Sequence, residues 1–137
     1  MNFALLILRI ALGVIMVAHG AQKLGWIAGG AGSLAGTVEF FQNTWNIPPF
    51  LTYCNVAAEF LGGLGVLVGL LGRIAAAAVA INMIVAIFVE HWPKFFNSEG
   101  GFEFPMSLFA IALALLITGM GQYSLDAVIA KGKKQAT

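Results

Sequence analysis

Residues 50–91 read FLTYCNVAAEFLGGLGVLVGLLGRIAAAAVAINMIVAIFVEH, two long apolar stretches that meet at Gly72. Each stretch, Phe50–Leu71 and Arg73–His91, has the length of ~20 residues that a helix needs to cross the hydrocarbon core of a bilayer. Because almost nothing separates the two stretches, the two helices have to run antiparallel. The sequence therefore predicts a tight membrane-spanning helical hairpin at its centre.

Two further apolar stretches flank this hairpin, at Phe3–Leu24 and Phe104–Gly121. Four such helices use most of the chain, so no room is left for a separate soluble domain. We predict an all-α fold, a transmembrane four-helix bundle that forms a single domain over residues 1–137. Its spans are expected at about 3–24, 50–71, 73–91 and 104–121, with a basic C-terminal tail at 122–137.

The composition favours a membrane protein over a soluble one. Of the 137 residues, 60% are apolar and 9% are charged, whereas soluble domains have about 45–50% apolar and about 25% charged residues. A soluble domain of this size cannot bury so much apolar surface. Cys54 is the only cysteine, which excludes a disulfide scaffold, and a net charge of +1 without a basic run in the body of the chain argues against nucleic-acid binding.

The first long loop contains a short amphipathic pattern. Its apolar residues recur at helical spacing, Ser33 can cap the start, and the proline pair at 48–49 ends it. We predict a helix that lies at the membrane interface in this outer loop. The apolar residues are Leu34, Val38, Phe41 and Trp45.

Lysine and arginine residues near the span ends indicate the orientation of the bundle. The end that holds both termini carries five of them, and the other end carries two, Lys23 and Lys94. We therefore predict a multi-pass protein of an inner or plasma membrane, with both termini in the cytoplasm and the two long loops outside. The five basic residues are Arg9, Arg73, Lys131, Lys133 and Lys134.

Ionisable side chains gather toward the outer ends of the predicted spans. Such a group inside a span costs ~2.5–3.5 kcal/mol on insertion scales, and it persists where it faces the bundle interior and finds a partner. His19, Gln22 and Lys23 share one helical stripe, and Glu59 is the deepest carboxylate. Because all four helices bring such groups to one end, we predict a shared polar pocket near the outer face. Its other members are Glu90, His91 and Glu103.

Two of these residues are candidates for catalysis. His19 and Glu59 are expected to hydrogen-bond a ligand and to move protons, while Lys23 biases the charge. The alternatives are a packed histidine and a structural hydrogen bond between helices. The expected ligand-binding residues are Lys23, Gln22, His91 and Glu103.

The polar residues at the opposite end, Arg9, Arg73 and Asp126, are expected to be structural. Arg9 lies about six residues into its span, close enough for its long side chain to reach the surface. We predict that this group anchors the inner face and contains one salt bridge with Asp126.

Short motifs follow one another along nearly the whole chain. They are Arg9-Ile-Ala-Leu-Gly13, His19-Gly20 with Lys23-Leu24, Glu59-Phe-Leu-Gly62-Gly63, Gly69-Leu-Leu-Gly-Arg73-Ile-Ala75, His91, Gly100-Gly101-Phe-Glu103 and Gly121-Gln-Tyr-Ser124-Leu125-Asp126. In this order and spacing they resemble the DoxX family of small four-helix membrane proteins. The family positions that the resemblance carries over are Arg9, His19, Lys23, Glu59, Arg73, His91, Glu103 and Asp126.

The resemblance implies a redox setting, because the wider family includes subunits similar to those of archaeal thiosulfate:quinone oxidoreductase and members linked to oxidative-stress and thiol-redox complexes. The leading interpretation is a membrane protein that binds a quinone or a similar apolar molecule in the polar pocket, as a subunit or partner of an oxidoreductase system. The alternatives are a non-catalytic membrane anchor or assembly partner, and a small-molecule or proton transporter that would need a homo-oligomer. Whether the chain is itself an enzyme stays open.

Haem or a metal ion is a less favoured alternative to a quinone. Imidazole and carboxylate groups suit several transition metals, but no pair here has ligand spacing, and His19 and His91 differ in depth by about 7 Å. Because Cys54 is the only cysteine, redox equivalents would have to pass through a cofactor, a quinone or a redox-protein partner. The expected partners are the lipid membrane, such a protein and a second copy of the chain, with no nucleic acid.

Overall fold

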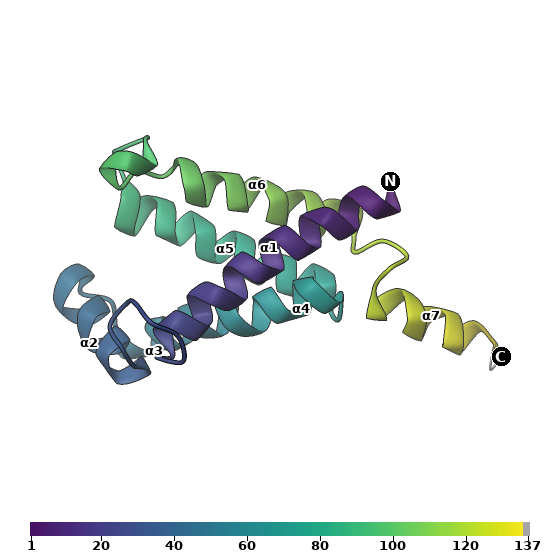
Figure 1. Cartoon of the computed structure of the whole chain (residues 1–137), viewed down its shortest axis with the longest axis horizontal. Coiled ribbons are helices and arrows are strands. Elements are labelled where there is room, and N and C mark those ends of the chain that lie inside the picture. The colour runs from purple at the N-terminus through teal and green to yellow at the C-terminus, as the bar shows by residue number, and fades with distance from the viewer. Residues whose placement is uncertain (136–137) are drawn as a thin grey trace.

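The computed structural model describes residues 1–135, which form helices and no strands. The first long helix is α1 (Asn2–Lys23). The second is continuous through α3 (Pro49–Ala57), a π-helical turn η1 (Ala58–Gly62) and α4 (Gly63–Val68). The third joins α5 (Gly72–Ala86) to a second π-helical turn, η2 (Ile87–His91), and the fourth is α6 (Glu103–Thr118). These helices pack against one another as a bundle (Figure 1), which confirms the predicted all-α class.

Three of the four helices are long and apolar enough to cross a membrane, and they comprise Asn2–Lys23, Pro49–Val68 and Gly72–His91. The fourth helix is shorter than the predicted span at 104–121. It stops at Thr118 because Gly119 adopts a positive φ of 81°, and its 16 residues cover about 24 Å at the rise of an α-helix. The prediction of a helical membrane bundle holds, but the fourth span falls short of the predicted length.

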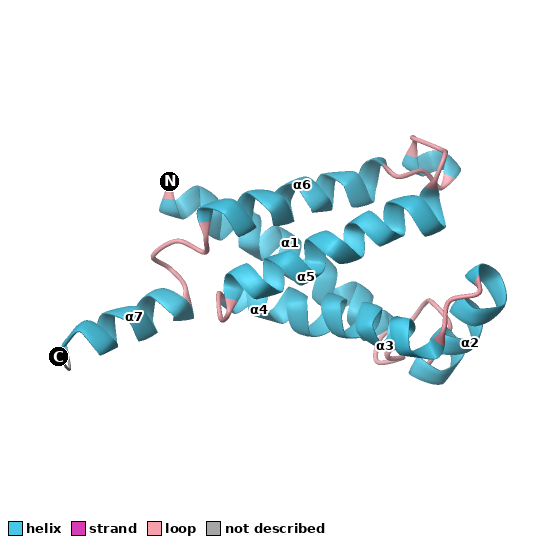
Figure 2. Cartoon of the chain, turned by 180° about the vertical axis from the view of Figure 1, so that it is seen from behind, coloured by secondary structure: helices cyan, strands magenta, loops and turns pink. Residues whose placement is uncertain are grey.

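The turn between α4 and α5 is as tight as predicted. Gly69 ends α4 with a φ of 70°, a conformation that favours glycine, and Leu71 follows with a φ of 48°. A methyl group added to Gly65 would lie 2.8 Å from the Cβ of Ala75, so the two helices approach closely here. Figure 2 shows the resulting antiparallel arrangement of α4 and α5 from behind.

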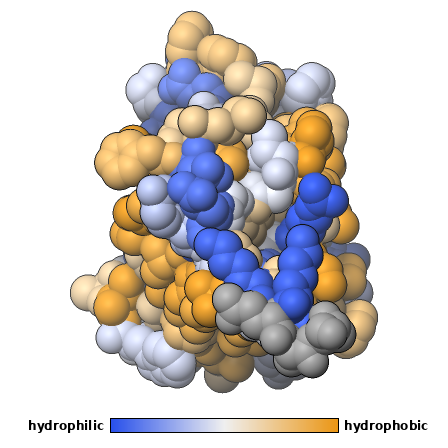
Figure 3. Space-filling view, turned by 90° about the vertical axis from the view of Figure 1, so that its right-hand side faces the viewer, coloured by the Kyte–Doolittle hydropathy of each residue, from blue (hydrophilic) through white to orange (hydrophobic). Residues whose placement is uncertain are grey.

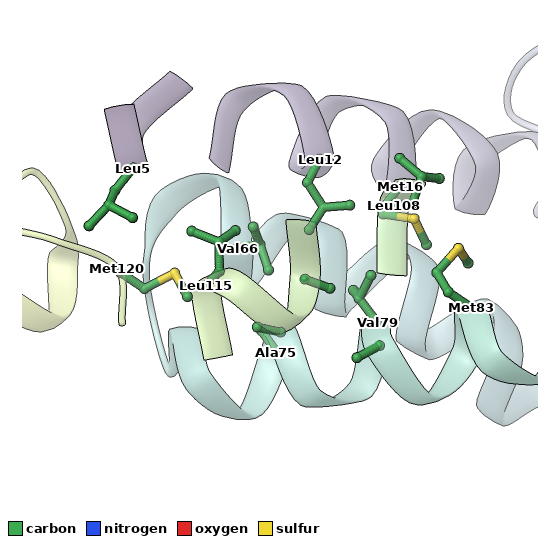
Figure 4. Packing of buried hydrophobic residues seen from close by; sticks show 13 residues of the cluster. Leu5, Leu12, Met16, Val66, Ala75, Val79, Met83, Leu108, Leu115 and Met120 are labelled. Carbon is green, nitrogen blue, oxygen red and sulfur yellow. The ribbon is translucent and has the colours of Figure 1, made fainter. Parts of the chain in front are cut away.

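The bundle core is apolar and lies between α1, α4, α5 and α6. Leu12, Val66, Val79 and Leu115 are completely buried, and Figure 4 shows them meeting from these helices. At Gly63 an added methyl group would lie 2.7 Å from the Cβ of Met16. The backbones of α1 and the second long helix therefore cross at close range, as small residues permit in membrane bundles.

The predicted amphipathic helix is present as α2 (Leu34–Trp45). The Ser33 hydroxyl oxygen accepts from the backbone N–H of Gly36 at 3.0 Å, which confirms the predicted cap. The Thr37 hydroxyl donates to the carbonyl of Lys23 at 2.9 Å, so α2 is tied to the last residue of α1. Asn46 ends the helix in the left-handed conformation.

The start of α1 and the last helix lie at the same end of the molecule, opposite α2 (Figure 1). Most of the predicted basic tail is a helix, α7 (Leu125–Gln135), which projects from the bundle; positions 136 and 137 of that tail lie outside the described residues. Figure 3 faces this end and shows hydrophilic residues gathered on it, with hydrophobic residues at the flanks.

Candidate functional site

A buried ion pair lies between α1 and η1. The Lys23 Nζ lies 2.6 Å from the Oε1 of Glu59, and the same ammonium donates to the Oδ1 of Asn55 at 2.8 Å. Glu59 is only 4% exposed, and the ring of Phe41 in α2 covers the ammonium, with its centroid 5.1 Å from Nζ. Lys23 and Glu59 were predicted to share a pocket, and the structure places them in direct contact.

Two asparagines complete the network around this carboxylate. Asn55 donates from Nδ2 to the Oδ1 of Asn82 at 2.7 Å, and Asn82 donates from Nδ2 to the Oε1 of Glu59 at 3.3 Å. Neither asparagine was among the predicted pocket residues. The available signal was the presence of amide side chains inside two otherwise apolar spans, where they need partners.

One oxygen of this network remains without a partner. Glu59 Oε1 accepts from Lys23 and Asn82, whereas Glu59 Oε2 is buried and has no hydrogen-bond partner among the described residues. An unsatisfied buried acceptor is costly, at ~1–3 kcal/mol. It is therefore the atom of the network best placed to accept from a bound molecule.

The ionisable residues of the second and third long helices that were predicted to form the pocket lie on π-helical turns. Glu59 belongs to η1, and Glu90 and His91 belong to η2. A π-helical turn holds an extra residue and is frequent at functional sites. It also shifts the side chains beyond it around the helix axis, so the regular helical spacing assumed from the sequence does not apply here.

A cavity of about 790 Å³ opens beside the ion pair and reaches all the long helices and α2. The predicted pocket residues that line it are His19, Gln22, Lys23, Glu59, Glu90 and His91. Its remaining wall is largely apolar and rich in aromatic rings. The rings belong to Phe40, Phe41, Trp45 and Phe104.

The two histidines are each held by one local hydrogen bond. The Nδ1 of His19 lies 2.9 Å from the carbonyl of Ile15, and the Nδ1 of His91 lies 2.8 Å from the carbonyl of Gly100. Because a carbonyl only accepts, each Nδ1 carries the hydrogen, and Nε2 is the acceptor of the neutral ring. Both rings line the same cavity, and the Nε2 of His91 lies 3.8 Å from the Oε2 of Glu90, which lines it too.

Gln22 and Glu103 relate to the cavity in different ways. Gln22 lines it and packs beneath Gly29 and Gly30 of the first loop. Glu103 lies outside its wall, and its Oε1 accepts from the backbone N–H of Asn97 at 2.6 Å. Because Asn97 does line the cavity, Glu103 positions a wall segment, and its direct contact with a ligand stays a prediction.

The predicted salt bridge with Asp126 is wrong, because neither Arg9 nor Arg73 forms an ion pair with it. Arg9 is 2% exposed, and its guanidinium lies in the bundle interior instead of reaching the surface. It donates to four backbone carbonyls. Carbonyl groups near a helix end can accept such hydrogen bonds because they have no partner within the helix. These are Val66, Leu67, Met120 and Tyr123, at 3.0, 2.9, 3.1 and 2.6 Å.

Asp126 caps a helix. Its two carboxylate oxygens accept from the backbone N–H groups of Leu71 and Gly72, both at 2.9 Å, at the N-terminus of α5, where a negative charge is favourable. Arg73 is exposed and makes one contact of 3.4 Å with the carbonyl of Ile117. Among residues 1–135, no three His, Cys, Asp or Glu side chains form a metal-ligating group.

Comparison with known proteins bears out the family resemblance. The DoxX family model matches residues 4–92. The chain is 33% identical over 129 residues to "Putative oxidoreductase CatD" of Bacillus subtilis (strain 168), which covers 94% of this chain and 89% of that protein. It is 30% identical over 122 residues to "Inner membrane protein YqjF" of Escherichia coli (strain K12), which covers 85% of this chain and 92% of that protein. No solved structure matches the chain significantly. The chain belongs to the DoxX family.

Proposed function

We propose that this membrane protein binds a quinone, or a similar apolar redox carrier, in the cavity of about 790 Å³, as a subunit or partner of an oxidoreductase system. The observation that carries this proposal is the unpartnered Glu59 Oε2 beside Lys23 at an aromatic-walled cavity. Such a carrier exchanges electrons together with protons. It therefore needs apolar walls and a few groups that donate or accept hydrogen bonds.

The wall of the cavity fits both the oxidised form of such a carrier, which has carbonyl oxygens, and the reduced form, which has hydroxyl groups. Ligand cavities are commonly about 300–1,000 Å³, and the flat rings of Phe41, Trp45 and Phe104 suit a planar head group. Lys23 donates to a carbonyl oxygen. Glu59 Oε2 and the imidazole Nε2 of His19 accept from a hydroxyl group.

The residues divide the work between binding and proton movement. Lys23 balances the charge of Glu59 in the low-dielectric interior, so the pair holds the ligand without a net buried charge. The imidazole rings of His19 and His91 can both take up and release a proton. We assign them the passage of protons between the ligand and the outer surface.

The apolar packing below the network favours binding over transport. Between the network and Arg9, the side chains of Leu12, Met16 and Val66 are buried and leave the interior apolar. A proton or a polar solute would need hydrogen-bonding groups along this stretch. We therefore place the function at the outer end of the bundle.

Location and orientation form part of the proposal. The names of the two relatives, "Putative oxidoreductase CatD" and "Inner membrane protein YqjF", support a redox role in an inner membrane. The start of α1 and α7 lie at the same end of the bundle, where Arg9 contacts Met120 and Tyr123 and Arg73 contacts Ile117. Under the positive-inside rule this end faces the cytoplasm.

Fluorescence of Trp45 tests quinone binding directly, because Trp45 lines the cavity whereas Trp26 and Trp92 do not. In a Trp26→Phe/Trp92→Phe variant in lipid nanodiscs, a short-chain quinone is expected to quench Trp45 with a saturating curve. The matched control is Trp45→Phe/Trp92→Phe, which keeps only the exposed Trp26. Quenching of both variants in simple proportion to quinone content would reflect quinone dissolved in lipid and would refute the proposal.

A further inference from the structure

A second cavity of about 450 Å³ adjoins the first one. Residues of the ion pair and of α2, including Lys23, Glu59, Phe41 and Trp45, line both cavities. The second cavity extends from this shared wall along the side of the bundle, between the second and third long helices. The two cavities therefore flank a single polar group, the Lys23–Glu59 pair.

The part of the second cavity farthest from the ion pair is apolar and opens on the side of the bundle that faces the lipid. Leu51 on the second long helix and Ile81, Val85 and Val89 on the third line it, and all four are exposed. Exposed apolar side chains along membrane-spanning helices contact the hydrocarbon chains of lipids. The second cavity is thus accessible from the bilayer, whereas the first is bounded partly by the loops beyond α1 and η2.

We propose that the second cavity holds the long apolar chain of the carrier whose head group occupies the first. This inference rests on the proposed function and narrows the ligand to a class that dissolves in lipid and carries an isoprenoid or acyl chain. The carrier enters between the second and third long helices. Its head then reaches Glu59 and Lys23, and its chain stays between Leu51 and Val85.

The energetics decide what the second cavity contributes. Lipid chains are as apolar as the cavity wall, so moving an apolar chain from the bilayer into the cavity gains no hydrophobic free energy. The cavity therefore selects by shape and sets the direction of entry, and it adds little affinity. A side chain that fills the cavity is expected to exclude long-chain carriers without affecting short-chain ones.

Val85 and Ile84 provide a matched pair for this test. They are neighbours on α5 with exposures of 46% and 41%, and only Val85 lines the second cavity. In the Trp26→Phe/Trp92→Phe variant, where Trp45 is the fluorescent reporter, Val85→Phe is expected to raise the Kd of a long-chain quinone about tenfold. It is expected to change the Kd of a short-chain quinone less than about twofold. Ile84→Phe is expected to change neither value.

Cys54 provides a second measurement in the unmodified protein. It is the only cysteine, it is exposed, and it lines the second cavity. A long-chain quinone with a fully substituted ring, which cannot add to a thiol, is expected to slow maleimide labelling of Cys54 about tenfold. The short-chain quinone is expected to leave the labelling rate unchanged.

The outcomes separate this inference from the proposed function. If both quinones bind, but Val85→Phe leaves long-chain binding intact and the long chain does not protect Cys54, the second cavity is not the chain site. The proposed function would then stand without it. If neither quinone binds the unmodified protein, the proposed function itself fails.

Discussion

Replacement of Arg9 by methionine is expected to lower the free energy of unfolding by about 3 kcal/mol or more. Methionine fills similar space, but it leaves four buried or partly buried carbonyls of two distant chain segments without their donor. Unfolding of the purified protein by heat or by added SDS, followed by circular dichroism, measures the effect. Arg9→Lys is expected to recover only part of the loss, because an ammonium has three donors and lacks the planar fork.

Arg73→Met is the matched control for this prediction. It removes the same charge from the same end of the bundle, but Arg73 is exposed and makes a single long contact. We expect its unfolding free energy to stay within about 0.5 kcal/mol of that of the unmodified protein. Equal losses for Arg9→Met and Arg73→Met would show that charge at this end matters and that the four carbonyl contacts do not.

Lys23→Met is expected to destabilise the fold by about 3–5 kcal/mol, because it leaves Glu59 buried and unpaired. The double variant Lys23→Met/Glu59→Leu removes both charges and is expected to regain most of this loss. Unfolding in detergent measures all the variants, including Glu59→Leu alone, as a double-mutant cycle. A double variant as unstable as the worse single one would contradict the view that the pair is a compensated buried charge.

The same variants distinguish stability from function. The folded double variant is expected to bind short-chain quinone at least about tenfold more weakly, because it has lost the donor Lys23 and the unpartnered Glu59 Oε2. Trp45 quenching measures this directly. If the double variant binds short-chain quinone normally, Lys23 and Glu59 are structural and not ligand-binding. If it binds no quinone and still supports full electron transfer in the oxidoreductase system, the chain is a membrane anchor or assembly partner.

The helices that the sequence predicts well are those with local signals. Ser33 starts α2 as predicted, and Gly69 and Gly72 fix the central hairpin. The predicted end of α2 at the proline pair is wrong, because Asn46 ends that helix and Pro49 begins α3. The end of α6 was placed too late because hydropathy continues through Met120, whereas the backbone conformation of Gly119 ends the helix. Local chemistry decides these boundaries, and hydropathy alone does not.

Only part of the candidate site could be predicted, and the reason differs from that for the helix boundaries. Depth along the spans was enough to bring His19, Lys23 and Glu59 to one cavity. The partners Asn55 and Asn82 depend on which helices face each other and on the π-helical turn at Glu59, which breaks the regular spacing. The predicted salt bridge with Asp126 failed for the same reason, because the acceptors of Arg9 are backbone atoms that carry no signature in the sequence.

The contacts of Arg9 also constrain the order in which the protein can be assembled during synthesis. Two of its acceptors belong to residues 66 and 67 and the others to residues 120 and 123, which are up to 114 positions away along the chain. While the ribosome is still producing α5, the first helix has already been made, and the guanidinium of Arg9 lacks two of its four hydrogen-bond acceptors. The contacts of Arg9 can therefore be completed only after nearly all of the polypeptide has emerged, and a chain that stops before Met120 would lack two of the four acceptors.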